Sequence, residues 1–304
     1  MSFSAEVKNE LCRAEVERSC CALGEALGVM LFANTFTAEE IRIVTESVDF
    51  AQRLPKLFRR GFGVTFDRLP AENGGGKLLF SITDQDKLER IFEMCGFSRS
   101  DSFSLHVNFA LLEKECCRRA FLRGAFLAGG SVTDPEKRYH LELSTTHGNA
   151  GREAEKLLSD MELEAKLTSR KGNRVLYFKQ SDIIETVLTT MGAPICAMTV
   201  MEAKINKSWR NIANRKTNCD SANLDKTVAA AGEQISAIEK LRELGILDTL
   251  PEKLIQTAAL REEHPEENLM DLGQLHEPPI SKSAVNHRIR KLMQLAKEAE
   301  ESEE

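Results

Sequence analysis

Two similar apolar segments that contain glycine, placed 96 residues apart, constrain the fold of this 304-residue chain more than any other feature. The first begins at Cys20-Cys21 with CCALGEALGVMLFANTF, and the second begins at Cys116-Cys117 with CCRRAFLRGAFLAGGSV. Glycine inside a helix costs about 0.5–1 kcal/mol relative to alanine, so Gly28 and its counterpart Gly124 need a structural reason. We expect two helices whose small residues let them pack closely against each other.

The same spacing recurs at Gly96 and Gly192, which each follow an apolar segment typical of a helix. Three matches at one offset indicate two copies of one unit, each predicted as helix, two strands, helix, two strands, helix, with a short first strand. Hairpin turns are expected at residues 73–76 and at Gly172-Asn173, and Ser181 is expected to cap its helix. Beyond the glycine helices, we expect strands at 41–47, 64–69, 77–83, 139–145, 166–170 and 174–179, and helices at 48–60, 84–95, 151–161 and 181–191.

Composition excludes several classes of protein. No run of 18 uninterrupted apolar residues is present, and the first residues lack the apolar core of a secretory signal, so we expect a cytoplasmic protein without membrane association. The eight cysteines lack C-x-x-C spacing and indicate reduced thiols; the two Cys pairs are interpreted as core residues at helix starts, with metal binding as the alternative. We expect no cofactor and no metal, and the net charge of −6 argues against nonspecific nucleic-acid binding over the whole surface.

A segment at 197–218 differs from its surroundings in charge and polarity. Its basic residues outnumber the acidic ones, and four polar side chains fall at i, i+3, i+4 and i+7, which places them on one stripe of a helix. The stripe consists of Asn211, Asn214, Arg215 and Asn218, with Arg210 and the single tryptophan, Trp209, beside it. These side chains suit either contacts with a DNA backbone or a solvated linker helix at an interdomain seam, and both interpretations stay open here.

The last part of the chain predicts several helices with recognisable ends. Gly245 is expected to end the helix that starts at Asp225, and residues 249–252 (TLPE) resemble a capping box that starts the next helix. Asn268 is expected to cap a short helix, and Ser281, which follows two prolines, is expected to cap a long one. A short second helix with a tight connection before the third indicates a helix-turn-helix module.

The final helix has an apolar face and an opposite face suited to DNA. Its apolar face consists of Val285, Ile289, Leu292 and Ala296, and at about 100° per residue the side chains of Ser283, Asn286, His287, Arg290 and Gln294 point the other way. Arginine, asparagine and serine recognise base edges, and basic neighbours suit phosphates. An ordinary solvated helix face is the alternative. We expect double-stranded DNA to contact eight residues: Ser281, Lys282, Ser283, Asn286, His287, Arg288, Arg290 and Lys291.

The two glycine segments resemble a known motif. Ala26–Phe36 and Leu122–Val132 are similar to two degenerate copies of the LAGLIDADG motif of homing endonucleases. The resemblance implies motif helices packed at a pseudo-twofold axis and sheets that saddle DNA. In active members, an acid before the last motif glycine binds the catalytic metal, and the matching positions here are Ala33 and Gly129. Because neither residue can bind a cation and phosphodiester cleavage needs one, the resemblance implies a scaffold without catalysis.

A LAGLIDADG-like pair followed by a helix-turn-helix resembles the WhiA regulators of Gram-positive bacteria over nearly the whole chain. The segments Asn211–Lys226 and Pro278–Leu292 are the most similar to that family. The resemblance implies an α+β fold, in which a pseudo-twofold LAGLIDADG-like tandem repeat precedes an all-α helix-turn-helix domain resembling sigma region 4. It also implies a nucleoid-associated DNA-binding regulator linked to sporulation, cell division and chromosome segregation.

We predict four segments: a first LAGLIDADG-like half at 1–110, a second at 111–195, a basic linker helix at 196–221 and the DNA-binding domain at 222–304. Two other functions stay open for the repeated part. The first alternative is an active nuclease or RNA maturase that uses the displaced carboxylates Asp134 and Glu142. The second is a docking module for a sigma factor or RNA polymerase.

Overall fold

The computed structural model describes residues 2–16, 18–70, 76–97 and 105–301, and the chain divides into two compact units, 1–208 and 209–304. Each unit has a hydrophobic core of its own, and the two cores share no residue. The long helix α8 (Pro194–Glu243) contributes residues to both units. Among the described residues, no helix is long and apolar enough to cross a bilayer.

The first copy of the repeat follows a helix that was not predicted. This helix, α1 (Phe3–Arg13), buries Val7 and Leu11 and packs on α3 and α5. The three strands of the copy form an antiparallel sheet in the order β1-β2-β3. The copy consists of α2 (Ser19–Leu31), β1 (Thr35–Phe36), β2 (Ile41–Thr45), α3 (Val48–Phe62), β3 (Leu78–Ile82) and α4 (Gln85–Cys95), followed by a short 3-10 turn at Phe109–Leu112.

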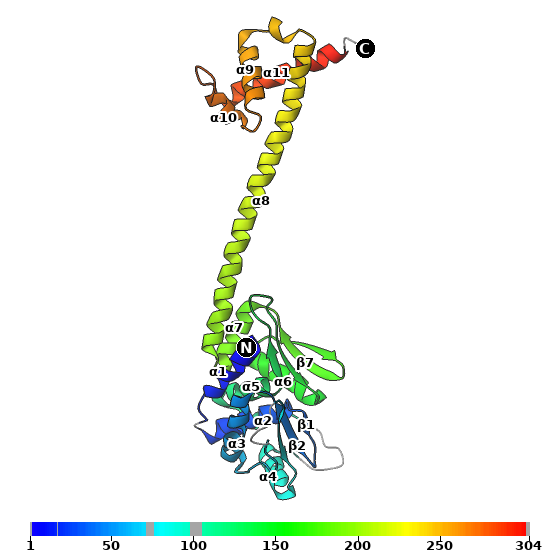
Figure 1. The fold of residues 1–304 in the computed structure, drawn as a ribbon. Helices are drawn as coiled ribbons and strands as arrows, with labels where there is room; N and C mark the ends of the chain where they lie inside the picture. Colours follow the sequence, from blue (N-terminus) through cyan, green and yellow to red (C-terminus); the bar gives the residue numbers. More distant parts are fainter. Residues whose placement is uncertain (1, 17, 71–75, 98–104, 302–304) are drawn as a thin grey trace. The chain divides into compact units, whose positions relative to one another are not determined.

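The second copy has the complete predicted order. Its four strands form an antiparallel sheet in the order β4-β5-β7-β6, and α5 and α6 pack against this sheet (Figure 1). A tight turn at Lys171-Gly172 joins β6 to β7, close to the predicted hairpin. The copy consists of α5 (Glu115–Gly129), β4 (Gly130–Val132), β5 (Leu141–Thr145), α6 (Gly148–Asp160), β6 (Lys166–Arg170), β7 (Asn173–Phe178) and α7 (Ser181–Met191).

Helices α2 and α5 pack side by side, as the repeat predicted (Figure 1). Their glycines lie in the contact. A methyl group on Gly28 would lie 2.9 Å from the Ala125 nitrogen, and one on Gly124 would lie 2.9 Å from the Glu25 carbonyl carbon. Real Cβ atoms do not approach this closely, so these two positions accept only glycine without a shift of backbone. Residues in the N-terminal half of α2 contact residues in the N-terminal half of α5, so the two helices run parallel.

Two predictions for this unit were wrong. The expected strand at 64–69 forms only an isolated bridge between Arg68 and Ser81, because the Asp67 carboxylate accepts from the backbone N–H groups of Thr83 and Asp84 where ladder bonds would continue. Ser181 is the first residue inside α7 and makes no capping bond, since Gln180 holds the capping position. The predicted turn at 73–76 falls largely outside the described residues.

The C-terminal unit contains the predicted series of helices, except that the helix expected to start at Asp225 is the last part of the continuous helix α8. After α8, Gly245 adopts the left-handed conformation with φ of 67° and ends the helix as expected. The TLPE capping box is absent: Thr249 lies in a 3-10 turn (Leu247–Thr249), its hydroxyl donates to the Ile246 carbonyl, and Pro251 precedes α9 instead. The helices that follow are α9 (Glu252–Glu263), α10 (Leu269–Gln274) and α11 (Lys282–Glu301). The predicted boundaries at 195 and 221 both fall inside α8, and they stay predictions.

Candidate nucleic-acid interface

Helix α11 packs against the rest of its unit through the apolar face that was predicted from the sequence. Val285, Ile289, Leu292 and Ala296 are all buried, in one core with Ala258 of α9 and with residues of α8 and α10. Because these four side chains recur every three or four positions, they orient the helix about its own axis. The opposite side of α11 is therefore held toward solvent.

The connection between α10 and α11 is fixed by backbone contacts. Asn268 caps α10 as predicted, and its side chain accepts from the N–H groups of Met270 at 2.9 Å and Asp271 at 3.2 Å. Gly273 lies directly under the chain that returns to α11, because a methyl group there would be 2.5 Å from the Ile280 carbonyl oxygen. The Ile280 N–H donates to the Gly273 carbonyl at 3.0 Å. The start of α11 is thus tied to the end of the short helix.

A buried polar relay joins α11 to the two helices before it. Arg288 Nη1 donates to the Thr257 hydroxyl at 3.2 Å, and that hydroxyl lies 2.9 Å from Nε2 of the buried His276. The other imidazole nitrogen, Nδ1, is 3.0 Å from the Leu272 carbonyl oxygen, which assigns its proton to Nδ1 and leaves Nε2 to accept from Thr257. Buried polar groups are costly unless they are paired, so this relay fixes the spacing of the three helices.

A buried arginine supports the α9–α10 connection. Burial lowers the pKa of Arg261, and Nη2 donates to the carbonyl oxygens of Glu267, at 2.6 Å, and of His264. These bonds hold the loop that leads to the Asn268 cap. Arg261 therefore positions α10, and it is not available to a ligand.

The predicted DNA-contacting residues divide into three groups. Ser281 caps α11, its hydroxyl accepting from the Ala284 N–H at 3.3 Å, and Arg288 is turned toward α9 by its bond to Thr257. Asn286 is half-buried beside the anchored face. The remaining five residues are exposed on the outer side of the helix: Lys282, Ser283, His287, Arg290 and Lys291. Within the described part of the chain, no carboxylate pairs with the three cations of that last group.

The predicted polar stripe on α8 is exposed, whereas two lysines of the same basic segment contact the N-terminal unit. The side chains of Arg210, Asn211, Asn214, Arg215 and Asn218 are all accessible, and the neighbouring Trp209 is 68% exposed.

By contrast, two lysines that precede this stripe hold the start of α8 against its own unit. Lys204 pairs with Asp182, and Lys207 donates to the Pro135 carbonyl at 2.5 Å and lies 4.4 Å from the centre of the Tyr139 ring.

The C-terminal ends of α2 and α5 lie against each other, with Ala33 and Gly129 at the positions where the motif has acidic residues. A methyl group on Gly129 would lie 2.9 Å from the Phe32 carbonyl oxygen, and Ala33 is buried beside it. Two carboxylates named as alternatives have other partners. Asp134 accepts from the Glu136 N–H at 2.9 Å within a turn, and Glu142 lies 3.1 Å from His140 and 3.6 Å from Arg170.

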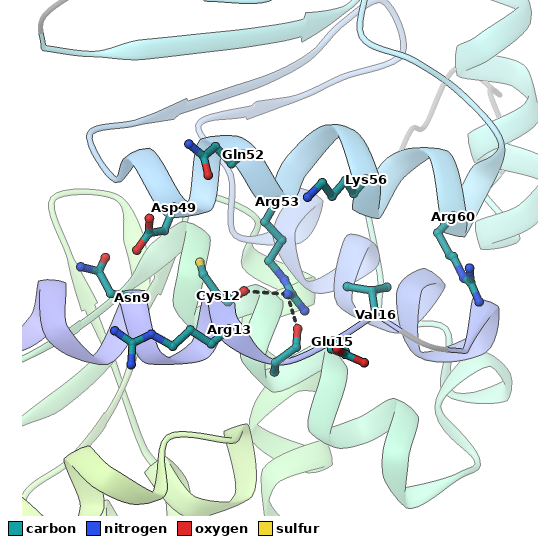
Figure 2. Close-up of a pocket in the computed structure, with 11 residues that line it drawn as sticks. Asn9, Cys12, Arg13, Glu15, Val16, Asp49, Gln52, Arg53, Lys56 and Arg60 are labelled. Atoms are coloured by element: carbon teal, nitrogen blue, oxygen red, sulfur yellow. Dashed lines mark hydrogen bonds between the residues drawn. The ribbon is translucent and has the colours of Figure 1, made fainter.

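A basic pocket of about 770 Å³ lies between α1 and α3, as Figure 2 shows. Its most buried lining residue, Arg53, is already satisfied: it donates to Glu25 at 2.5 and 2.8 Å and to the carbonyls of Cys12 and Ala14. Burial alone would lower the pKa of Arg53, but the hydrogen bonds and charge of Glu25 outweigh it and raise the pKa. Burial also raises the pKa of Cys12 to about 12. The pocket therefore offers neither a reactive thiol nor an unpaired buried cation.

Two groupings were missed in the sequence. Glu25 on α2 pairs with Arg53 of α3 and lies 3.5 Å from Arg123 of α5, forming a buried ion network that joins the three helices. A lone acid in an otherwise apolar helix was the available signal. The two Cys pairs lie at helix starts as predicted, but their four sulfur atoms also lie within 4.8 Å of one another, a closeness that depends on helix pairing.

These features define a class of protein: a LAGLIDADG-like domain without its motif acids, together with a C-terminal helix-turn-helix domain. Residues 118–210 match the family described as the WhiA LAGLIDADG-like domain, and residues 213–296 match the WhiA C-terminal HTH domain. The chain belongs to the WhiA family.

Its relatives match over nearly their full length. The Probable cell division protein WhiA of Ruminiclostridium cellulolyticum is 38% identical, covering 97% of both chains. The protein of the same name from Alkaliphilus oremlandii is 38% identical, covering 99% of this chain and 98% of the relative. The crystal structure of full-length DUF199/WhiA from T. maritima has a TM-score of 0.61 at 22% identity, covers 98% of this chain and 99% of that one, and supports the fold.

Proposed function

We propose that this protein is a sequence-specific DNA-binding regulator that acts in cell division and does not cleave DNA. Family membership supports the role in cell division, because the relatives carry that description. The single observation that carries the DNA-binding part is α11, whose exposed side combines Ser283, His287 and Arg290 with Lys282 and Lys291, for which the described residues supply no carboxylate partner. Sporulation, chromosome segregation and a sigma factor or RNA polymerase partner are finer proposals that rest on the family resemblance alone.

In the proposed complex, the first half of α11 enters the major groove. Arg290 donates to a guanine edge in the bidentate manner that its planar guanidinium favours, and Asn286 and Ser283 contact neighbouring bases. Lys282 and Lys291 contact phosphates and add affinity without sequence preference. Ser281 and Arg288 support this arrangement from inside the domain, through the helix cap and the bond to Thr257.

The repeated domain serves as a scaffold in this proposal. Cleavage of a phosphodiester needs a metal ion to activate water and stabilise the leaving oxygen, and Ala33 and Gly129 supply no ligand at the motif ends. Magnesium-dependent nicking of supercoiled DNA that disappears in Asp134→Ala would contradict the non-catalytic part of the proposal.

The DNA-binding part is tested by a gel shift on genomic fragments identified by footprinting. Arg290→Ala should weaken specific binding by about 5- to 150-fold, because a bidentate base contact contributes about 1–3 kcal/mol. Lys297→Ala, an exposed change near the end of the same helix, is the matched control and should bind normally. Unchanged affinity and sequence preference in Arg290→Ala, at stated salt, would show that this face of α11 does not recognise DNA.

A further inference from the structure

The pairing of α2 with α5 brings four cysteines together. Cys20 and Cys21 are the second and third residues of α2, and Cys116 and Cys117 are the second and third residues of α5. The four Sγ atoms all lie within 4.8 Å of one another. The thiol of Cys21 contacts that of Cys116, and the thiol of Cys20 contacts that of Cys117, so the two cross-helix contacts are related by the internal repeat.

The spacing of these sulfur atoms is close to that of a tetrahedral metal site. Zinc binds cysteine sulfur at about 2.3 Å, which places the sulfur atoms of a tetrahedral site with four cysteine ligands about 3.8 Å apart. The Cys116 and Cys117 sulfur atoms are 4.0 Å apart. The cluster therefore needs only small side-chain rotations to surround one ion.

Disulfide bonding explains the cluster less well. All four residues are free thiols in the structure. Bonds within each pair are disfavoured, since the Cα atoms of consecutive residues lie about 3.8 Å apart and disulfides usually need about 4.4–6.8 Å. Only the two cross-helix bonds would be feasible, and they are one outcome of the experiment below.

The helix starts beside the cluster suit a negatively charged centre. The capping positions of α2 and α5 hold Arg18 and Lys114, and neither helix has a side-chain cap. Basic residues oppose the dipole at a helix start, where serine, threonine, aspartate or asparagine are usual. A zinc ion with four thiolates carries two net negative charges, which these two cations and the uncapped N–H groups of both helices would offset.

The cluster is within reach of solvent. A pocket of about 210 Å³ opens onto Cys21 and Cys116 and is lined by Arg18 and Arg119. Cys117 is buried and closes the cluster on its inner side. A metal ion can therefore reach the sulfur atoms from outside, while the site itself is part of the helix interface.

We propose that Cys20, Cys21, Cys116 and Cys117 bind one structural zinc ion. Four protein ligands leave no position for water or substrate, which is the arrangement of structural rather than catalytic zinc. The ion would join the first turns of the two motif helices, about 18 Å along the helix axis from Ala33, at the opposite end from the lost acidic positions. This proposal does not depend on DNA binding.

The metal content of the protein tests the proposal directly. Untagged full-length protein, purified in reductant from cells grown with added zinc and then desalted, should contain about one zinc ion per chain by mass spectrometry of the elements. Cobalt added to the metal-free wild-type protein should produce the ligand-field bands of a tetrahedral tetrathiolate site. This second measurement does not depend on the folding of any variant.

A pair of double variants separates the cluster from the other thiols. Cys20→Ser/Cys116→Ser removes one ligand from each helix and should reduce the zinc content to below about 0.1 ion per chain. Cys12→Ser/Cys219→Ser, which changes two thiols outside the cluster, should retain about one ion per chain.

Four results would overturn the proposal: wild-type protein without zinc, equal zinc in the two double variants, iron in place of zinc, or cross-helix disulfides in wild-type protein that was kept reduced.

Discussion

At the scale of single residues, the close packing of α2 and α5 depends on two positions that carry no side chain. Gly28 and Gly124 stand at equivalent positions of the two repeats, and each places the backbone of the facing helix where a side chain would otherwise be. Nearby, Glu25 is buried between two arginines, and removing one partner of such a network leaves an uncompensated charge. The interface therefore tolerates neither added volume nor lost charge.

Gly124→Ala should destabilise the N-terminal unit strongly. The added methyl group would lie 2.9 Å from the Glu25 carbonyl carbon and 3.0 Å from the Val29 nitrogen, and these backbone atoms can move only if the helices separate. We expect a loss of about 3 kcal/mol, or about 6–12 °C in melting temperature. Gly148→Ala is the matched control, since nothing lies within 4 Å of its added methyl group. Equal melting temperatures for the two variants would show that the α2–α5 packing is looser than described.

At the scale of elements, the position of α11 depends on polar as well as apolar contacts. Its apolar face sets the rotation of the helix, and the relay of Arg288, Thr257 and His276 sets its distance from α9 and α10. The exposed basic side is thus presented by groups that never contact DNA in the proposed function. Substitutions beneath α11 should therefore reduce stability and DNA binding together.

Thr257→Val tests the relay. Valine keeps the branched shape of threonine but removes the hydroxyl, so the buried His276 and the half-buried Arg288 each lose a hydrogen-bond partner. We expect a cost of about 1–3 kcal/mol in the C-terminal unit. Thr227→Val is the control, because the hydroxyls of Thr227 and Thr257 each lie 2.9 Å from the carbonyl oxygen four residues earlier, on Asn223 and Lys253, but Thr227 has no part in the relay. A loss of similar size in both variants would mean that the relay contributes nothing.

At the scale of the whole molecule, each of the two hydrophobic cores supports a different part of the protein. The N-terminal core contains the glycine interface, and the C-terminal core anchors the helix proposed to bind DNA. The chain is acidic on balance, with a net charge of −6, so binding to nucleic acid depends on where the cations gather and not on their total.

Calorimetry should resolve two unfolding transitions, because two cores without shared residues need not unfold together. Gly124→Ala should lower the temperature of one transition, and Thr257→Val should lower that of the other. A single transition that both variants shift equally would show that the units unfold as one.

The sequence by itself determined the repeat, most of the helices and the orientation of α11. These follow from local rules: a glycine spacing of 96 residues, an apolar period of three to four, and caps such as Asn268 that bond to their own helix. The strand at 64–69 was missed because the Asp67 carboxylate accepts from Thr83 and Asp84, 16 and 17 residues further along the chain. The two capping errors were local: Gln180 holds the capping position of α7 in place of Ser181, and the Thr249 hydroxyl donates to the Ile246 carbonyl three residues earlier.

Only the tertiary structure decided which distant residues meet. Glu25 and Arg53 are 28 residues apart and meet because α2 packs on α3. Cys21 and Cys116 belong to different repeats and meet because α2 packs on α5. Arg288 similarly points toward α9, although its position on the helix suggested a phosphate contact. The physical reason is that helix period and capping depend on neighbours in the chain, whereas ion pairs and metal ligands depend on how helices pack in space.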